Sequence, residues 1–114
     1  VRVAAALGVA LLVGCGGMPR PTEQLIATER AVRAAEEHDP ESHPKAALHL
    51  KLAREQLEKA RRFMDVDDND RATWYLRRAE SDAEVARVMA KTKFLREEAA
   101  RALKEVERLK ASFQ

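Results

Sequence analysis

The sequence contains no glycine after Gly17 and no proline after Pro44, and this feature limits the possible folds more than any other. Glycine and proline are the residues that most often interrupt a helix, so the stretch from Lys45 to Gln114 has few places to stop. Ala, Leu, Glu, Arg and Lys dominate the composition, and aromatic residues make up only 4%. This composition is typical of long helices and coiled coils. The sequence therefore predicts an all-α protein.

We expect three helices, at about 22–38, 44–64 and 70–112, within a helical domain that spans residues 22–114. Two prolines break the chain between the first two helices, because each disfavours helical geometry in the residue before it. Asp67, Asp68 and Asn69 are N-cap candidates for the third helix. That helix would be about 64 Å long and the second about half as long. We predict a three-helix antiparallel bundle with a long, overhanging, coiled-coil-like third helix.

The second helix has an unusually wide apolar face. One stripe at helical spacing is followed by a second apolar strip, and His49 and Gln56 lie between the two. A face of this width predicts burial against two neighbouring helices. The first stripe consists of Ala46, Leu50, Ala53, Leu57, Ala60 and Met64, and the second of Leu48, Leu52 and Phe63.

The third helix has two heptad series, which lie roughly 160° apart at 100° per residue. The first, nearly all alanine, is expected to pack inside the bundle: Ala72, Leu76, Ala79, Ala83, Ala86 and Ala90. The second consists of Val85, Val88, Thr92, Leu95, Ala99, Ala102, Val106, Leu109 and Phe113. From Leu95 onward this second series needs a partner, so its residues are candidates for a protein interface. Trp74 is a separate candidate, because Trp is over-represented at interface hot spots.

The N-terminal residues have the pattern of an export signal. Arg2 precedes an apolar run over residues 3–13, which is shorter than the approximately 20 residues of a membrane-spanning helix. The sequence Leu12-Val13-Gly14-Cys15 resembles the lipobox of bacterial lipoproteins. That resemblance implies cleavage of a signal peptide over residues 1–14 and acylation of Cys15, with residues 15–21 as a lipidated tether. Gly16, rather than Asp, after the cysteine implies the periplasmic face of the outer membrane.

Charge and motif content argue against nucleic-acid binding, metal binding and catalysis. The net charge is +2, and removal of Arg2 with the signal peptide leaves +1, with both signs interspersed. Asp65, Asp67 and Asn69 match the start of an EF-hand loop, but the positions of its Gly and its bidentate Glu hold Asp70 and Leu76.

Three histidines within a short stretch, His38, His43 and His49, lack the further ligands that zinc needs. Ser42 next to His43 is a local pair in a proline turn, not a nucleophile with an activating base. We therefore expect no enzyme activity, no metal site, no cofactor and no small-molecule substrate.

The helical region from about Pro21 to Ala111 resembles an uncharacterised family of bacterial helical lipoproteins, some of which are fused to OmpA-like peptidoglycan-binding domains. The similar features are Leu25 and Ala31, the run Ala46-Ala47-Leu48 with the apolar positions to Ala60, and Asp70 with the alanine series to Ala86. The resemblance implies an envelope location and a helical fold, without a known activity.

Three functional hypotheses follow. The first is a structural or adaptor lipoprotein, held on the membrane by acylated Cys15 and bound through the third helix to an envelope protein or to a second copy. The alternative is a periplasmic module that binds a ligand or ion near the first loop or Trp74. The third is an accessory or regulator of an enzyme, in which the heptads serve internal packing alone.

Overall fold

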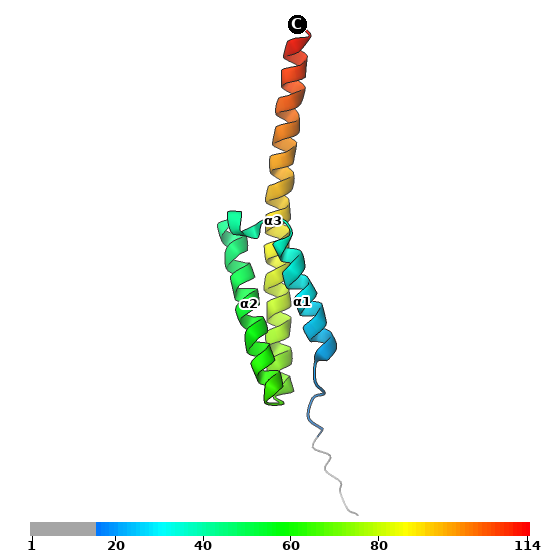
Figure 1. Cartoon of the computed structure of the whole chain (residues 1–114), viewed down its shortest axis with the longest axis vertical. Coiled ribbons are helices and arrows are strands. Elements are labelled where there is room, and N and C mark those ends of the chain that lie inside the picture. Colours follow the sequence, from blue (N-terminus) through cyan, green and yellow to red (C-terminus); the bar gives the residue numbers. More distant parts are fainter. Residues whose placement is uncertain (1–15) are drawn as a thin grey trace, which may run out of the picture.

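The computed structural model describes residues 16–114 and is helical almost throughout (Figure 1). It contains α1 (Thr22–Glu36), a 3-10 turn η1 (Pro40–Ser42), α2 (Pro44–Asp65) and α3 (Asn69–Ser112). The chain ascends in α1, descends in α2 and ascends again in α3, which continues far beyond the other two helices. The all-α class and the overhanging third helix are thus confirmed. The predicted signal peptide, the predicted lipobox and Cys15 lie outside the described residues.

Both interruptions end in a residue that caps the following helix. Nδ1 of His43 accepts a hydrogen bond from the backbone N–H of Ala46 at 3.2 Å, and Pro44 occupies the first turn of α2. At the start of α3, the Asp68 carboxylate accepts from the Arg71 N–H at 3.2 Å. These bonds satisfy backbone donors that have no partner within the helix. Asp68 is therefore the N-cap among the three candidates.

Helix α1 is shorter than predicted and ends at Glu36 rather than His38. The chain turns immediately after it, and Asp39 adopts the left-handed region with φ of 49° before Pro40 begins η1. Proline disfavours helical geometry in the residue that precedes it, so Asp39 cannot continue α1, and residues 37–38 form the turn before it. His38 instead packs on Phe94 of α3, with ring centroids 5.4 Å apart.

Helix α3 is the centre of the bundle, because α1 and α2 both pack on it and contact each other little. Its first heptad series faces them and is completely buried, from Ala72 to Ala90. Alanine side chains let neighbouring helices approach closely, since the side chains at the contact set the distance between helix axes. The prediction that this series forms the interior of the bundle is confirmed.

Few large side chains fill the remaining core. Leu50 and Met64 of α2 and Leu76 of α3 are almost wholly buried, together with Val32 and Thr28 of α1. The Thr28 hydroxyl donates to the carbonyl of Gln24 at 2.8 Å and lies 3.4 Å from the carbonyl of Leu76. Its polar atom is therefore satisfied despite its burial.

Helix α2 contacts both other helices, as predicted, but its wide apolar face is not buried over its whole width. Its first stripe is buried against α3, but Leu48 of the second strip is 54% exposed, and Leu52 and Phe63 are half-buried. The second strip stays partly exposed because α1 packs mainly on α3 and does not cover that side of α2. The side of α2 beyond the α3 contact is consequently left partly open.

Candidate functional site

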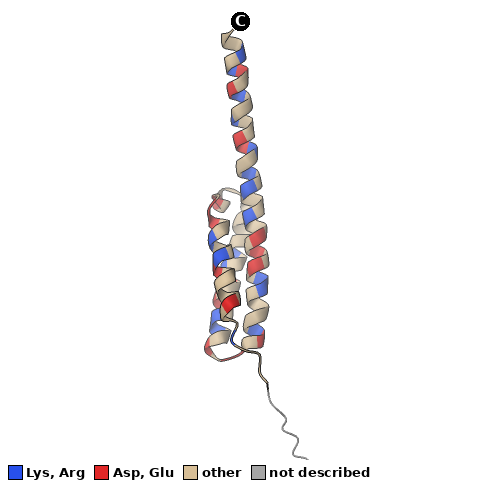
Figure 2. Cartoon of the chain, turned by 90° about the vertical axis from the view of Figure 1, so that its right-hand side faces the viewer, with Lys and Arg blue, Asp and Glu red and all other residues tan. Residues whose placement is uncertain are grey.

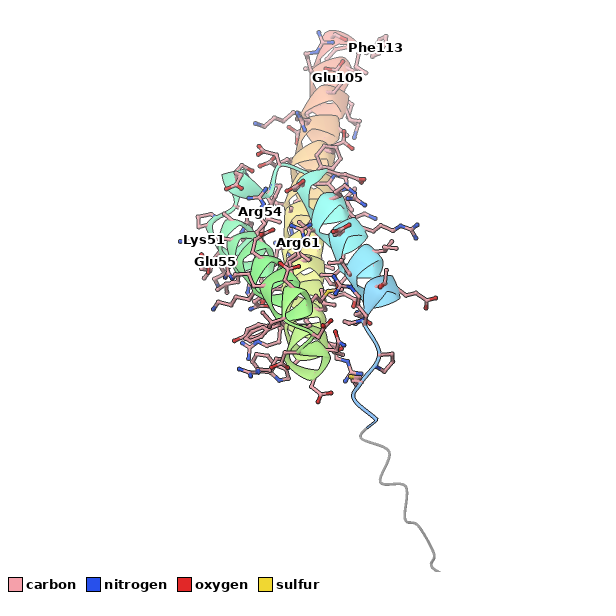
Figure 3. All side chains as sticks on the ribbon, turned by 60° about the horizontal axis from the view of Figure 1, so that its bottom comes forward. Lys51, Arg54, Glu55, Arg61, Glu105 and Phe113 are labelled. Carbon is pink, nitrogen blue, oxygen red and sulfur yellow. The ribbon has the colours of Figure 1, made fainter. Side chains whose placement is uncertain are left out.

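The segment of α3 from Leu95 to its end projects from the bundle, and every residue in it is exposed (Figures 1 and 2). The last contacts with the rest of the chain lie just before it. Lys93 Nζ donates to the carbonyl and the hydroxyl of Ser42, at 3.1 and 2.8 Å, and Phe94 contacts His38. Glu105 and Phe113 therefore lie far from the labelled residues of α2 (Figure 3). The bundle therefore ends at Lys93 and Phe94.

The second heptad series of α3 forms one continuous exposed surface, which we call the distal stripe. It comprises Val85, Val88, Thr92, Leu95, Ala99, Ala102, Val106, Leu109 and Phe113. Its large members are between 37% exposed at Val85 and 87% exposed at Phe113. Leu103, which follows the stripe residue Ala102, is 66% exposed. An exposed apolar surface that continues over so many helical turns is typical of an interaction site.

The stripe and the bundle occupy opposite sides of α3. Ala86 and Ala90 point into the core, whereas Val85 and Val88 in the same two turns are exposed. Near this overlap a shallow groove is lined by Val88, Met89 and Thr92 of α3 and by His43 of the loop before α2. The accessible apolar surface thus extends from the groove to the tip of the helix without crossing a helix contact.

Basic and acidic residues occur along the whole of α3 (Figure 2), and some of them form ion pairs within the helix. Glu105 accepts from Arg108 at 2.6 Å, and Glu84 accepts from Arg87 at 2.6 Å. The hydrogen bond from arginine lowers the pKa of each of these two carboxyl groups below its usual range. Pairs three residues apart make a small contribution to helix stability. They leave the apolar positions of the stripe uncovered.

Trp74, the other predicted interface residue, lies in a separate aromatic cluster at the opposite end of the bundle. Its ring meets that of Tyr75 edge-on at 4.8 Å, and Tyr75 stacks on Phe63 of α2 at 5.4 Å. The Arg78 guanidinium lies 4.7 Å from the Trp74 ring centre. Trp74 remains 52% exposed, but about 31 Å of helix separates it from Leu95. The structure does not bring it together with the distal stripe.

The tether approaches the bundle at this same end. Asn69 Nδ2 donates to the carbonyl of Met18 at 3.0 Å, and Arg20 donates to the carbonyl of Met64 at 2.8 Å. The residues that follow Cys15 are therefore held beside the turn between α2 and α3. From Asn69, α3 extends for about 66 Å away from that turn.

A polar cluster between α2 and α3 was not predicted. Asp82 accepts from Gln56 Nε2 at 3.0 Å, and its other oxygen lies 2.8 Å from His49 Nδ1. Gln56 is 8% exposed, and its Oε1 has no partner within residues 16–114. The position of His49 and Gln56 between two apolar strips was the available signal, and Asp82 next to the buried Ala83 was the missing third member.

The three histidines have separate structural contacts. His38 packs on Phe94, His43 caps α2, and His49 pairs with Asp82. In the described part of the chain, no three His, Cys, Asp or Glu side chains lie close enough together to hold a metal ion. The loop from Asp65 to Asn69 serves as the turn between α2 and α3, with Asp67 in the left-handed region at φ of 57°.

A family profile described as a domain of unknown function (DUF4398) matches residues 23–102. The chain belongs to the DUF4398 family. The match covers α1, α2 and the part of α3 that includes the stripe as far as Ala102, so DUF4398 similarity extends past the top of the bundle. No curated protein and no solved structure matches the chain. Among residues 16–114, no helix has both the length and the hydropathy of a membrane span.

Proposed function

We propose that this DUF4398 chain is a non-catalytic adaptor of the bacterial envelope, anchored by lipid at its N-terminus and bound to a protein partner through the distal stripe. The observation that supports this most strongly is the exposure of the stripe over the whole projecting half of α3. Exposure of the apolar surface of the distal stripe to water costs a free energy of roughly 25 cal/mol for each Å² that a partner could cover. A bound protein would recover that free energy.

The polar contacts in the described residues have structural roles, which favours binding over catalysis. They cap α2 and α3, join the three helices to one another, hold the tether and the loop before α2, or pair side chains along one helix. Examples are the bond of Arg54 to Glu36 at 2.6 Å and that of Arg61 to Glu29 at 2.8 Å, both between α1 and α2. Such pairs contribute little individually and fix the arrangement of the short helices.

The anchor part of the proposal rests on the lipobox and on the position of the tether. Acylation of Cys15 would attach the protein to the outer membrane on its periplasmic side, because two or more acyl chains hold a protein stably. The tether meets the bundle at the α2–α3 turn, so the distal stripe would point away from the lipid surface. A partner could then bind at a distance of several nanometres from the membrane.

Labelling with a fatty acid tests the anchor. Cells that express the full chain should incorporate label into the protein, and Cys15→Ser should abolish incorporation. Equal labelling of both proteins, or of neither, would contradict acylation at Cys15. This result bears on the anchor and leaves the binding role of the stripe to a second experiment.

Photo-cross-linking in cells tests the binding role. A photoreactive residue at Val106, within the stripe, should form a discrete protein adduct. The same residue at Lys104, on another side of the same helical turn, should not. A stripe position that forms no adduct, or adducts that are equal at both positions, would contradict the adaptor role.

A further inference from the structure

We propose that the partner of the distal stripe is the same stripe of a second copy, and that the two α3 helices form a parallel, two-stranded coiled coil. This inference rests on the proposed function and names its partner. The residues of the stripe repeat every three and four positions from Val85 to Phe113, a length of about 42 Å.

The residue types at the two core positions of the heptad favour two parallel strands. With Val85 at position a, three of the five a positions are β-branched and two of the four d positions are leucine. Position a holds Val85, Thr92, Ala99, Val106 and Phe113, and position d holds Val88, Leu95, Ala102 and Leu109. β-branched residues at a with leucine at d are the combination that favours parallel dimers over larger assemblies. The Ala99 and Ala102 layers would bring the two helices closest together in the middle.

Charges beside the core distinguish the two possible orientations. In a parallel pair, Glu105 at position g lies opposite Lys110 at position e of the second copy, which is an attractive pair. Lys91 opposite Arg96 is repulsive, and Glu98 meets the apolar Leu103. In an antiparallel pair with Ala99 opposite Ala102, Glu98 would face Glu105 of the second copy, and flanking pairs would offer no compensating attraction. The parallel orientation is therefore preferred.

The bundle leaves room for this arrangement. Helices α1 and α2 cover the alanine face of α3, on the side opposite the stripe, so a second α3 can approach along the stripe. Toward the N-terminus the same heptad positions hold Ser81 and Arg78, and the Arg78 guanidinium packs on Trp74. The coiled coil would thus begin at Val85. A parallel pair also places both tethers at one end, as attachment to a single membrane requires.

Sedimentation equilibrium of residues 16–114 tests dimer formation, since this fragment contains the complete described core. The mass should change from one chain to two as the concentration rises. Two adjacent alanines provide a matched pair of variants. Ala99→Asp places a charge in the core and should weaken dimerisation by roughly a hundredfold or more. Ala100→Asp, at an outer position with the same change of side chain, should alter it by less than about threefold.

Single cysteines test the orientation. In a parallel pair in register, Leu95→Cys and Val106→Cys should each form a disulfide with the same position of the second copy, and Ala100→Cys should not. In the antiparallel pair the two copies of residue 95 would be about 16 Å apart, too far for a disulfide. Linkage only in a mixture of the two stripe variants would overturn the parallel arrangement.

Failure of this inference and failure of the proposed function give different results. A fragment that is monomeric at every concentration, with no disulfide at position 95 or 106, would overturn self-association. Stripe adducts in cells to a different protein would then still support the adaptor role. A dimer in solution without any stripe adduct in cells would support the inference and contradict the adaptor role.

Discussion

Replacement of Leu76 by alanine should destabilise the bundle by about 3 kcal/mol. Leu76 is 0% exposed and lies in the alanine face of α3, where α1 and α2 both pack. Loss of its buried methyl groups and the cavity left behind cost about 2–5 kcal/mol for a leucine. The alanines around it are too small to fill the space, so we expect a loss above the lower limit. For a domain of this size, 1 kcal/mol lowers the Tm by roughly 4–8 °C, so the Tm should fall by about 12–24 °C.

The control for this experiment lies on the same helix. Leu103→Ala removes an equal volume from a side chain that is 66% exposed, and we expect a change within about 0.5 kcal/mol. Urea and thermal unfolding of residues 16–114, followed by circular dichroism at a concentration where the fragment is monomeric, would measure both variants. A loss below about 1 kcal/mol for Leu76→Ala, or equal losses for the two variants, would refute the assignment of core and projecting segment.

Three further predictions concern the same division of α3. Ala83→Leu should overpack the helix interface and lower the free energy of unfolding in urea by about 1–3 kcal/mol. Ala100→Leu, on the exposed helix, should be nearly neutral. Equal effects of the two substitutions would show that the alanine face is not close-packed. Asp68→Ala should remove the N-cap of α3 and cost about 1 kcal/mol, with Asp70→Ala as the control; loss of stability in the control alone would contradict the cap. The backbone amides of residues 97–112 should exchange hydrogen quickly in the monomer, because an isolated helix of this length is marginally stable in water. If these amides were as well protected in dilute solution as those of residues 72–90, the segment would not project from the bundle.

Sequence patterns predicted the helices closely because their ends have local causes. Pro44 and Asp68 define the starts of α2 and α3 within a residue, and the absence of glycine and proline lets α3 continue to Ser112. The division of α3 into a buried and an exposed series also followed from spacing alone. Alanine and the bulkier residues occupy opposite sides, and only one side can face the two short helices.

Contacts between helices were harder to predict. The width of the apolar face of α2 suggested two neighbours, but whether α1 packs on α2 or on α3 depends on the path of the loop around Asp39 and Pro40. The pairing of Asp82 with His49 and Gln56 depends on the relative shift of α2 along α3. Periodicity within one helix contains no information about that shift. The proposed partner of the stripe is another chain, so residue types at the heptad positions are the available guide to it.

Thiol labelling in intact cells tests most directly whether the distal stripe is covered by protein. Two full-length variants, Ala99→Cys and Ala100→Cys, place the same thiol on adjacent residues of the exposed helix. We predict that a membrane-permeant maleimide labels Ala100→Cys quickly and Ala99→Cys much more slowly, with the difference lost on denaturation. Equal and rapid labelling of both variants in cells would mean that the stripe remains in water, and would contradict a binding role for α3.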